Sequence, residues 1–309
     1  MIAMPFFLRA LLDLFLPREC LACGCRLGLR ERHLCLSCAA DVPYTYYWLQ
    51  AHNPLADRFN AVLERHRDAA ERMDYAYAAA LMHYKGPYRA IPRALKYHGN
   101  LDAGRFYGSL LGRRIASAPH FADVDLILPV PLHWTRRRSR GYNQAEILAR
   151  AVCATLNASR SAPTDDPACH SEEDGVRRRN LPPPIRCRTD ILLRARRTRT
   201  QTKLTVEQKA SNVASAFRVS FLRSRLFALP RSRYSASQRS RLDRESPREA
   251  LDHARHILLV DDTFTTGATL YACYAALRPF TSARISIATL AAVEGNVEAE
   301  VSGSEHKGP

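Results

Sequence analysis

The sequence lacks the features of a membrane-spanning or secreted protein. No run of the chain reaches the roughly 18 apolar residues that a membrane-spanning helix needs. The apolar N-terminal stretch, 1–16, is interrupted by Arg9 and Asp13, and it has neither a basic leading segment nor a small-residue cleavage site. Its apolar positions suit an amphipathic helix instead. We therefore expect a cytoplasmic protein.

The chain is also short of acidic residues. It has 30 Asp and Glu against 46 Lys and Arg in 309 residues, so its formal net charge is +16. This excess favours an anionic partner such as nucleic acid, a membrane surface or a polyphosphate. Basic stretches at 136–140, 194–203 and 223–255 carry much of the charge, although such stretches are often only solvated loops.

No internal repeat is present, and predicted strands alternate with predicted helices. The strands are expected at 76–84, 126–131, 191–193, 217–221, 257–260 and 285–290, and the helices at 89–96, 104–117, 145–156 and 270–277. This alternation indicates a mostly parallel sheet, which binds its ligands beyond the carboxyl ends of the strands. The predicted α/β domain covers 75–292, with two insertions rich in Ser and Arg near 157–188 and 222–254.

Nine cysteines are present, and their spacing indicates metal binding rather than disulfides. Two Cys-x-x-Cys pairs lie close together near the N-terminus: Cys20, Cys23, Cys35 and Cys38. Four thiolates complete a tetrahedron with no open position, as in a structural zinc site. We predict a zinc-binding unit over 17–50 that depends on the metal to fold. Cys25 is a spare thiol and His33 an alternative ligand; free cysteines or a redox dithiol are the competing interpretations.

The segment 257–270, ILLVDDTFTTGATL, combines an apolar strand, two acids and a loop of small residues. Its start has the length and branching of a buried parallel strand, which is expected to end at Asp261 and Asp262. The loop leads into a predicted helix, where backbone N–H groups, threonine hydroxyls and the helix dipole attract an anion. Acids beside such a loop suit a sugar phosphate, because carboxylates accept hydrogen bonds from vicinal hydroxyls. The segment resembles the motif that binds phosphoribosyl diphosphate (PRPP) in type I phosphoribosyltransferases; a strand–helix turn with an acidic cap is the competing interpretation.

Two further polar segments suit a diphosphate, because guanidinium groups can bind it in a bidentate manner. One follows the predicted strand at 126–131, where Gly141 allows a tight turn and Asn143 can cap the next helix. The other, at 194–201, suits a loop that closes over phosphates. A basic surface loop is the alternative for both. The candidate diphosphate residues are Pro131, Arg136, Arg140, Arg194 and Arg196.

Taken in order, these segments resemble the ComF family of bacterial proteins, which have a zinc-ribbon-like N-terminus and a phosphoribosyltransferase domain and are linked to DNA uptake or utilisation. The resemblance rests on the cysteine unit, KYHG at 96–99, PVP at 129–131, RGYNQ at 140–144, the stretch 194–201, Asn212 and the loop 261–269. The chain departs from the family in its insertions, and in Lys209 where an arginine is usual.

The resemblance implies a phosphoribosyltransferase-like fold and a distinct role for each part of the loop. Asp261 and Asp262 would bind the ribose hydroxyls, and the turn at 129–132 would lie near the diphosphate. The residues implied to bind the 5′-phosphate are Thr265, Thr266, Gly267, Ala268 and Thr269.

Two functions remain open from the sequence. One is a PRPP-dependent transferase, with Mg²⁺ held mainly by the ligand's own oxygens; no residue indicates a nucleophile, and no base-binding segment is recognisable. The other is a single-stranded DNA-binding module that retains a non-catalytic phosphoribosyl pocket. In that case basic loops would contact the backbone and the aromatic residues of the segment 44–48 would stack on bases, although these aromatics also suit plain packing.

Overall fold

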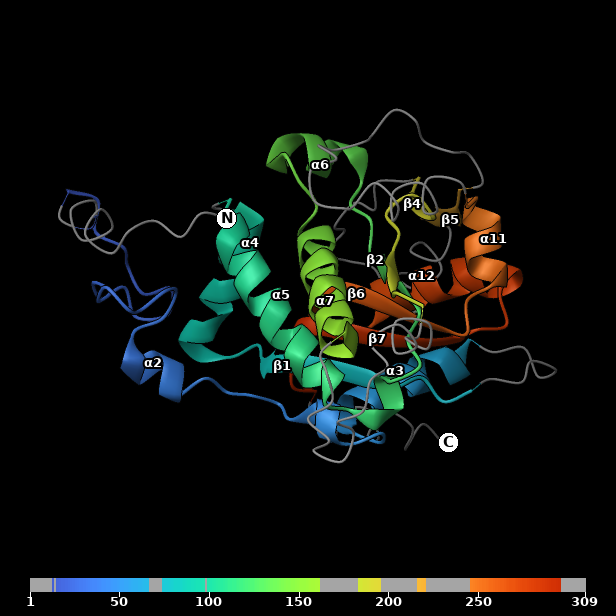
Figure 1. Cartoon of the computed structure of the whole chain (residues 1–309), viewed down its shortest axis with the longest axis horizontal. Helices are drawn as coiled ribbons and strands as arrows, with labels where there is room; N and C mark the ends of the chain where they lie inside the picture. Colours follow the sequence, from blue (N-terminus) through green and yellow to red (C-terminus); the bar gives the residue numbers. More distant parts are fainter. Residues whose placement is uncertain are drawn as a thin grey trace, which may run out of the picture.

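Apolar segments of the chain form a central sheet of five strands, all of them parallel. The computed structural model describes residues 13, 15–66, 74–97, 99–161, 183–195, 216–220 and 245–295. Neighbouring strands follow the order β1-β7-β6-β2-β3 (Figure 1). The strands span Ala78–His83 (β1), Leu126–Pro129 (β2), Arg186–Cys187 (β3), His256–Phe264 (β6) and Arg284–Ala292 (β7). The expectation of a mixed α/β fold with a mostly parallel sheet is confirmed.

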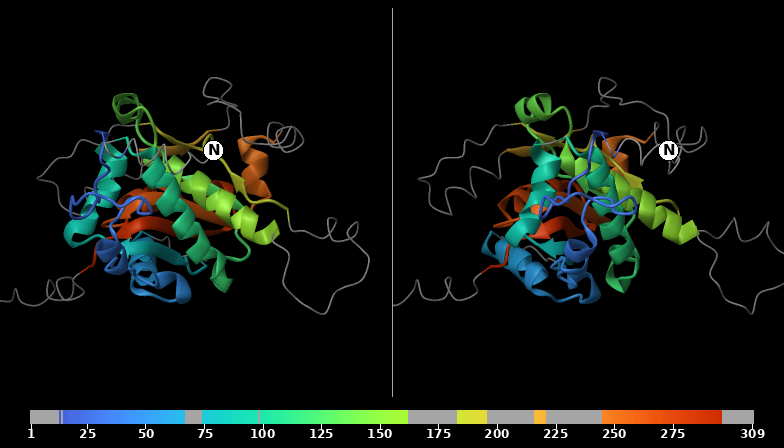
Figure 2. Two further views of the ribbon diagram at one scale, coloured as in Figure 1. Left: turned by 60° about the vertical axis from the view of Figure 1, so that its left-hand side comes forward. Right: turned by 90° about the vertical axis from the view of Figure 1, so that its left-hand side faces the viewer.

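Helices cover both faces of this sheet. Successive side chains along a strand point to opposite faces, so they enter two different hydrophobic cores. On β6, Ile257 and Leu259 pack with the helices of one face, whereas Leu258 and Val260 pack with those of the other. The first face carries α3 (Pro54–Arg65) and α12 (Ala268–Leu277), and the second carries α4 (Ala90–Tyr97), α5 (Leu101–Ala116) and α7 (Gln144–Ser161). Figure 2 shows α5 and α7 side by side over the sheet. Burial on both faces explains why β6 begins as an unbroken apolar run.

Two predicted strands pair with each other instead of joining the sheet. Leu192–Arg194 (β4) and Phe217–Val219 (β5) form a separate antiparallel ribbon. The strand β6 also continues through both acids to Phe264, so the prediction that it ends at the acids is wrong. Its outer half pairs with β7, whose long apolar run extends the ladder to Ala292.

Several elements were not expected from apolar periodicity. The basic segment 136–140, for which no helix was predicted, lies in a helix, α6 (Trp134–Arg140), and α11 (Pro247–Asp252) lies within the predicted insertion 222–254. A capping box between Ser246 and Glu249 starts α11, and Asn53 caps α3. The remaining short helices are α2 (Leu36–Ala40), η1 (Tyr47–Leu49), η2 (Gly86–Arg89), η3 (Pro119–Phe121) and η5 (Arg278–Phe280). None of the helices in the described ranges has the length and apolar character needed to cross a bilayer.

Candidate functional site

The two adjacent acids lie on β6 near the carboxyl edge of the sheet. Asp262 is buried, with 8 % of its surface exposed, and its Oδ2 lies 3.1 Å from Nζ of Lys96 at the end of α4. Asp261 is half-buried, and its Oδ1 accepts a hydrogen bond of 2.8 Å from the backbone N–H of Asp262. Burial, followed by the negative charge of Asp262, raises the pKa of Asp261 to about 7. The carboxyl group of Asp261 therefore takes up a proton more readily than an ordinary aspartate.

The loop after β6 turns directly into the N-terminus of α12. Thr265 and Thr266 are exposed, and Oγ1 of Thr266 accepts a hydrogen bond of 3.5 Å from the backbone N–H of Ala268. Gly267 is the N-cap and has a φ of +78°, a conformation that favours glycine. A glycine cap contributes no side-chain acceptor, so the N–H groups that follow Ala268 in the first turn have no side-chain cap and can serve an anion.

An arginine of α3, far from the loop in sequence, holds this loop in place. Arg58 of α3 donates hydrogen bonds of 2.8 Å to the carbonyl of Thr265 and 2.6 Å to the carbonyl of Val293. Its guanidinium also lies 5.2 Å from the ring centroid of Phe264. The partners are 207 and 235 positions away in sequence, so no local pattern could have indicated this residue.

The end of β2 lies beside the acids. The backbone N–H of Val130 donates to the carbonyl of Val260 at 2.9 Å, which continues the β2–β6 ladder to Val130, the residue before Pro131. The Asn143 side chain donates to the carbonyl of Val130 at 3.0 Å and accepts from the N–H of Ala145 at 3.2 Å, so it both caps α7 and fixes the turn. The strands β2 and β6 are neighbours in the sheet, but the chain leaves them in opposite directions. After β2 it forms β3 on one side of the pair, and after β6 it forms β7 on the other side. Such a divergence opens a crevice at the carboxyl edge, where α/β proteins bind ligands.

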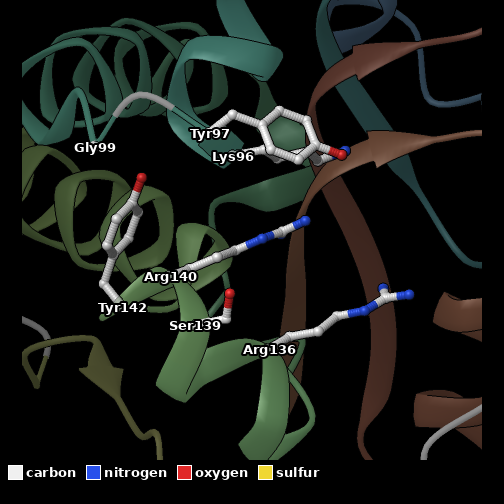
Figure 3. A pocket seen from close by; sticks show the side chains of 7 residues that line it. All are labelled: Lys96, Tyr97, Gly99, Arg136, Ser139, Arg140 and Tyr142. Carbon is white, nitrogen blue, oxygen red and sulfur yellow. The ribbon is translucent and has the colours of Figure 1, made fainter.

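A basic cavity of about 370 Å³ adjoins the acids. Its lining comes from the end of α4, from α6 and from the following turn: Lys96, Tyr97, Gly99, Arg136, Ser139, Arg140 and Tyr142. Figure 3 shows the side chains of Arg136 and Arg140 extending from α6 in the same direction. The Arg140 guanidinium lies 5.2 Å from the ring centroid of Tyr97, and the Tyr142 hydroxyl donates to the carbonyl of Leu95. Gly141, with a φ of +78°, ends α6 and allows the turn.

Of the residues predicted to bind diphosphate, the structure brings Arg136 and Arg140 into this cavity. Arg194 ends β4, where burial and then the positive charge of Arg136 lower its pKa, while Asp261 acts in the opposite direction. Arg194 therefore lies within electrostatic reach of both the cavity and the acids. Arg196 is outside the described residues, as are Lys209 and Asn212.

The four cysteines of the two Cys-x-x-Cys pairs converge on one point. Their Sγ atoms all lie within 4.8 Å of one another, a spacing that could hold a structural metal ion such as zinc. A backbone hydrogen bond from Cys25 is the main cause that lowers the pKa of Cys23, to about 6, whereas burial raises the pKa of Cys38. The alternative ligand His33 is buried against Phe106, with ring centroids 5.1 Å apart, and is not part of the cluster.

The cysteine unit packs onto the main domain. The Tyr88 hydroxyl donates to the carbonyl of Cys38 at 3.0 Å, and Leu27 and Leu34 share a core with Trp48 and β1. Trp48 is only 2 % exposed, so it packs rather than presents a stacking surface, whereas Tyr46 is 55 % exposed. Tyr44 and Tyr47 are each half-buried.

Neither a protein-family model nor a curated protein sequence matches this chain.

Proposed function

We propose that the chain binds PRPP at the carboxyl edge of its sheet, as a phosphoribosyltransferase-like protein of the ComF type associated with DNA uptake or utilisation. One observation carries the proposal: two adjacent acids lie on β6, beside the point where the strand order diverges from β2, and the loop after them leads into a helix N-terminus without a side-chain cap. Carboxylates suit the ribose hydroxyls, and the N–H groups of α12 suit the 5′-phosphate. A phosphoribosyl group needs both kinds of partner.

Each part of the ligand has a counterpart in the site. Asp261 and Asp262 would accept hydrogen bonds from the ribose hydroxyls, and the loop 265–269 would hold the 5′-phosphate. The diphosphate would lie between the Pro131 turn and the guanidinium groups of Arg136, Arg140 and Arg194, which suit it in charge and geometry. Mg²⁺ would be held mainly by the diphosphate oxygens.

Binding of the ligand must displace one contact. Lys96 now pairs with Asp262 at 3.1 Å, so a ribose hydroxyl that approaches this carboxylate competes with the ammonium group. A diphosphate offers Lys96 a stronger partner nearby, because a phosphate oxygen carries charge that a hydroxyl lacks. The ion pair thus keeps the buried carboxylate compensated until the ligand arrives.

Isothermal titration with PRPP and Mg²⁺ tests the proposal. We expect saturable binding by the native chain and a loss of about tenfold or more when Asp261 and Asp262 are both replaced by Asn, because hydrogen bonds to charged groups are lost. Asp252→Asn is the matched control, since this exposed acid lies on α11 and pairs only with Arg248 among the contacts of the described residues. Absence of binding at millimolar PRPP would refute the proposal.

The cysteine cluster supports a second part of the proposal, a structural zinc ion. Four thiolates leave no open coordination position, so the metal would fold the unit and not take part in chemistry. The unit would then act as a rigid support beside α5, which His33 contacts through Phe106, and beside η2, where Tyr88 donates to the carbonyl of Cys38.

A non-catalytic module for single-stranded DNA is the second candidate function, and one observation favours it. Tyr97 and Trp134 are 70 % and 64 % exposed; Trp134 begins the basic helix α6, and Tyr97 lies beside Arg140 at the end of that helix. Exposed aromatics beside arginines suit stacked bases and a phosphate backbone. Fluorescence anisotropy with a labelled oligonucleotide separates the candidates. DNA binding that survives loss of both acids but disappears when Arg137 and Arg138 become Glu would favour the DNA-binding module.

A further inference from the structure

We propose that Cys23 and Cys25 form a modification site for a hydroperoxide, at which Cys23 is oxidised and Cys25 then closes a disulfide with it. This site rests on the structural metal ion proposed for the cysteine unit and is independent of PRPP. Three features of the unit point to it: a fifth thiol beside the four-thiol cluster, the exposure of two neighbouring thiols, and the turn that joins them.

The cysteine unit holds one thiol more than a tetrahedral metal site uses. Cys20, Cys23, Cys35 and Cys38 make up the four-thiol cluster, and Cys25 is outside it. The Cys25 thiol nevertheless lies within hydrogen-bonding reach of the thiols of Cys23 and Cys35. The four ligand thiols would be committed to the metal, whereas a fifth thiol beside them stays free to react. Cys25 therefore stands where a resolving cysteine is needed, next to a cysteine that can be oxidised.

Exposure selects Cys23 as the ligand that a small oxidant reaches. Cys23 is exposed, whereas the other three thiols of the cluster are buried or half-buried. A metal ligand is a thiolate, and the thiolate is the form of cysteine that reacts with a peroxide. Cys25 is exposed as well, so both thiols of the proposed site can be reached from solvent.

The turn between the two thiols suits a disulfide. Gly24 separates them with a φ of +75°, and a Cβ built there would meet no atom within 4 Å, so the turn has open space around it. The competing partner is Cys35, whose Sγ lies 3.8 Å from that of Cys23. However, Cys35 is the N-cap of α2, and its sulfur accepts a hydrogen bond of 3.5 Å from the N–H of Cys38. A disulfide to Cys35 would break this cap and take two ligands from the metal, whereas a disulfide to Cys25 takes only one.

The oxidation balances with a hydroperoxide as the only co-reactant. The Cys23 thiolate attacks one oxygen of the peroxide, the O–O bond breaks, and hydroxide leaves with the electron pair of that bond, so that Cys23 becomes a sulfenic acid. The Cys25 sulfur then attacks the Cys23 sulfur and gives up its proton. The S–S bond forms, and the S–O bond breaks to release water. Together the two cysteines lose two electrons, and the peroxide is reduced to hydroxide and water.

The disulfide would act on the packing of the unit against the main domain. Cys23 in a disulfide supplies no thiolate, so the metal would keep only three of its ligands and would be released. The unit depends on the metal for its fold, and its residues Leu27 and Leu34 share a core with Trp48 and β1. Oxidation is therefore expected to loosen this contact, and reduction restores the four thiolates.

Hydrogen peroxide and peptide mapping test the site. The zinc-loaded full chain is treated with increasing peroxide, the remaining thiols are alkylated, and the tryptic peptides are analysed by mass spectrometry. The tryptic peptide 19–26 contains Cys20, Cys23 and Cys25, so a label on Cys20 alone identifies a disulfide between the other two. We expect this product, and we expect a colorimetric chelator to detect zinc release in step with its formation.

Cys25→Ser and Cys25→Ala are the matched variants, because they leave the four-thiol cluster intact. Both should bind zinc when reduced. Without a resolving thiol, however, their Cys23 proceeds to sulfinic acid, which thiol reductants do not restore. After peroxide, reduction and addition of zinc, the native chain should regain most of its zinc, whereas the two variants should lose most of this capacity.

Every outcome decides either the site or the metal. A disulfide that joins Cys23 to Cys35, no disulfide at all, or variants that regain zinc as fully as the native chain would overturn the inference. So would failure of both variants to bind zinc, since Cys25 would then be a ligand. If the native chain takes up no zinc, the structural metal ion is refuted, and the same disulfide map of the metal-free chain decides whether Cys25 resolves Cys23.

Discussion

Replacing Gly108 by alanine sets two measurable effects against each other. In an isolated helix, alanine is more favourable than glycine by about 1 kcal/mol, so α5 by itself would gain stability. In the folded protein, however, an added Cβ would lie 2.8 Å from Cβ of Ala151, 3.1 Å from the carbonyl oxygen of Leu148 and 3.2 Å from its Cα. These atoms belong to α7 and are backbone or attached directly to it, so they move only if the helices separate. Overpacking of this kind costs about 1–3 kcal/mol.

Because three atoms of α7 lie within 3.2 Å of the added Cβ, we take the upper part of this range, about 2–3 kcal/mol. Subtracting the propensity gain of about 1 kcal/mol, we expect Gly108→Ala to lower the free energy of unfolding by about 1–2 kcal/mol. Gly104→Ala is the control on the same helix, because its Cβ would meet Cγ2 of Ile147 at 2.9 Å and Cδ2 of Leu95 at 3.4 Å, which are side-chain ends. Side chains can rotate away, so this change should cost less. Urea unfolding followed by circular dichroism, with zinc held constant, measures both. A Gly108→Ala protein as stable as the native chain, or no less stable than Gly104→Ala, would refute the reasoning.

Cys35→Ser should abolish the binding of one metal ion in native mass spectrometry, whereas Cys25→Ser, outside the four-thiol cluster, should retain it; equal loss in both would contradict the cluster. His256 is fully buried, with its two ring nitrogens on Asp123 and on a serine of β7, and burial lowers its pKa. The unfolded chain then binds the proton more readily, so stability is complete above pH ~6.5 and falls as the pH drops below that value; His256→Gln should flatten this part of the urea-stability profile. Asp261, with its pKa raised to about 7, acts in the opposite sense, because its contribution falls as the pH rises from ~4 towards 7. Asp261→Asn should therefore be more stable than the native chain at pH 8 but not at pH 4, and no gain at pH 8 would count against the raised pKa. Arg58→Ala removes two hydrogen bonds to loop carbonyls and should lower stability by about 1–3 kcal/mol and PRPP affinity several-fold; unchanged PRPP affinity in calorimetry would show that the loop holds its shape without it.

The strands that were predicted well are those buried on both faces. The first half of β6 and most of β7 are apolar runs because their side chains are buried on both faces, and this pattern is visible in a short window. The two-residue β3 has the sequence Arg186-Cys187, and no pattern of that length can distinguish a strand from a loop. The basic helix α6 was missed for a related reason, since it has no buried residue and thus no apolar period.

The sequence also could not show which strands pair with one another. β4 and β5 were expected as strands, but their apolar residues cannot show that they pair with each other rather than with the main sheet. Likewise, β6 continues past Asp261 and Asp262 because β7 beside it offers backbone groups as far as Ala292. A polar residue ends an apolar pattern, yet it does not end a ladder of backbone hydrogen bonds.

The sequence by itself determined the alternation of strands and helices, the four-cysteine cluster, and the order of strand, acids, loop and helix at 257–277. Each of these features depends on the spacing of residues within a short segment, where covalent geometry limits the positions that their side chains can take. Only the tertiary structure decided that Lys96 pairs with Asp262, that Arg58 holds the Thr265 loop, and that α4 and α6 enclose a basic cavity. These contacts join segments far apart in the chain, and they exist because the strand order brings those segments to one edge of the sheet.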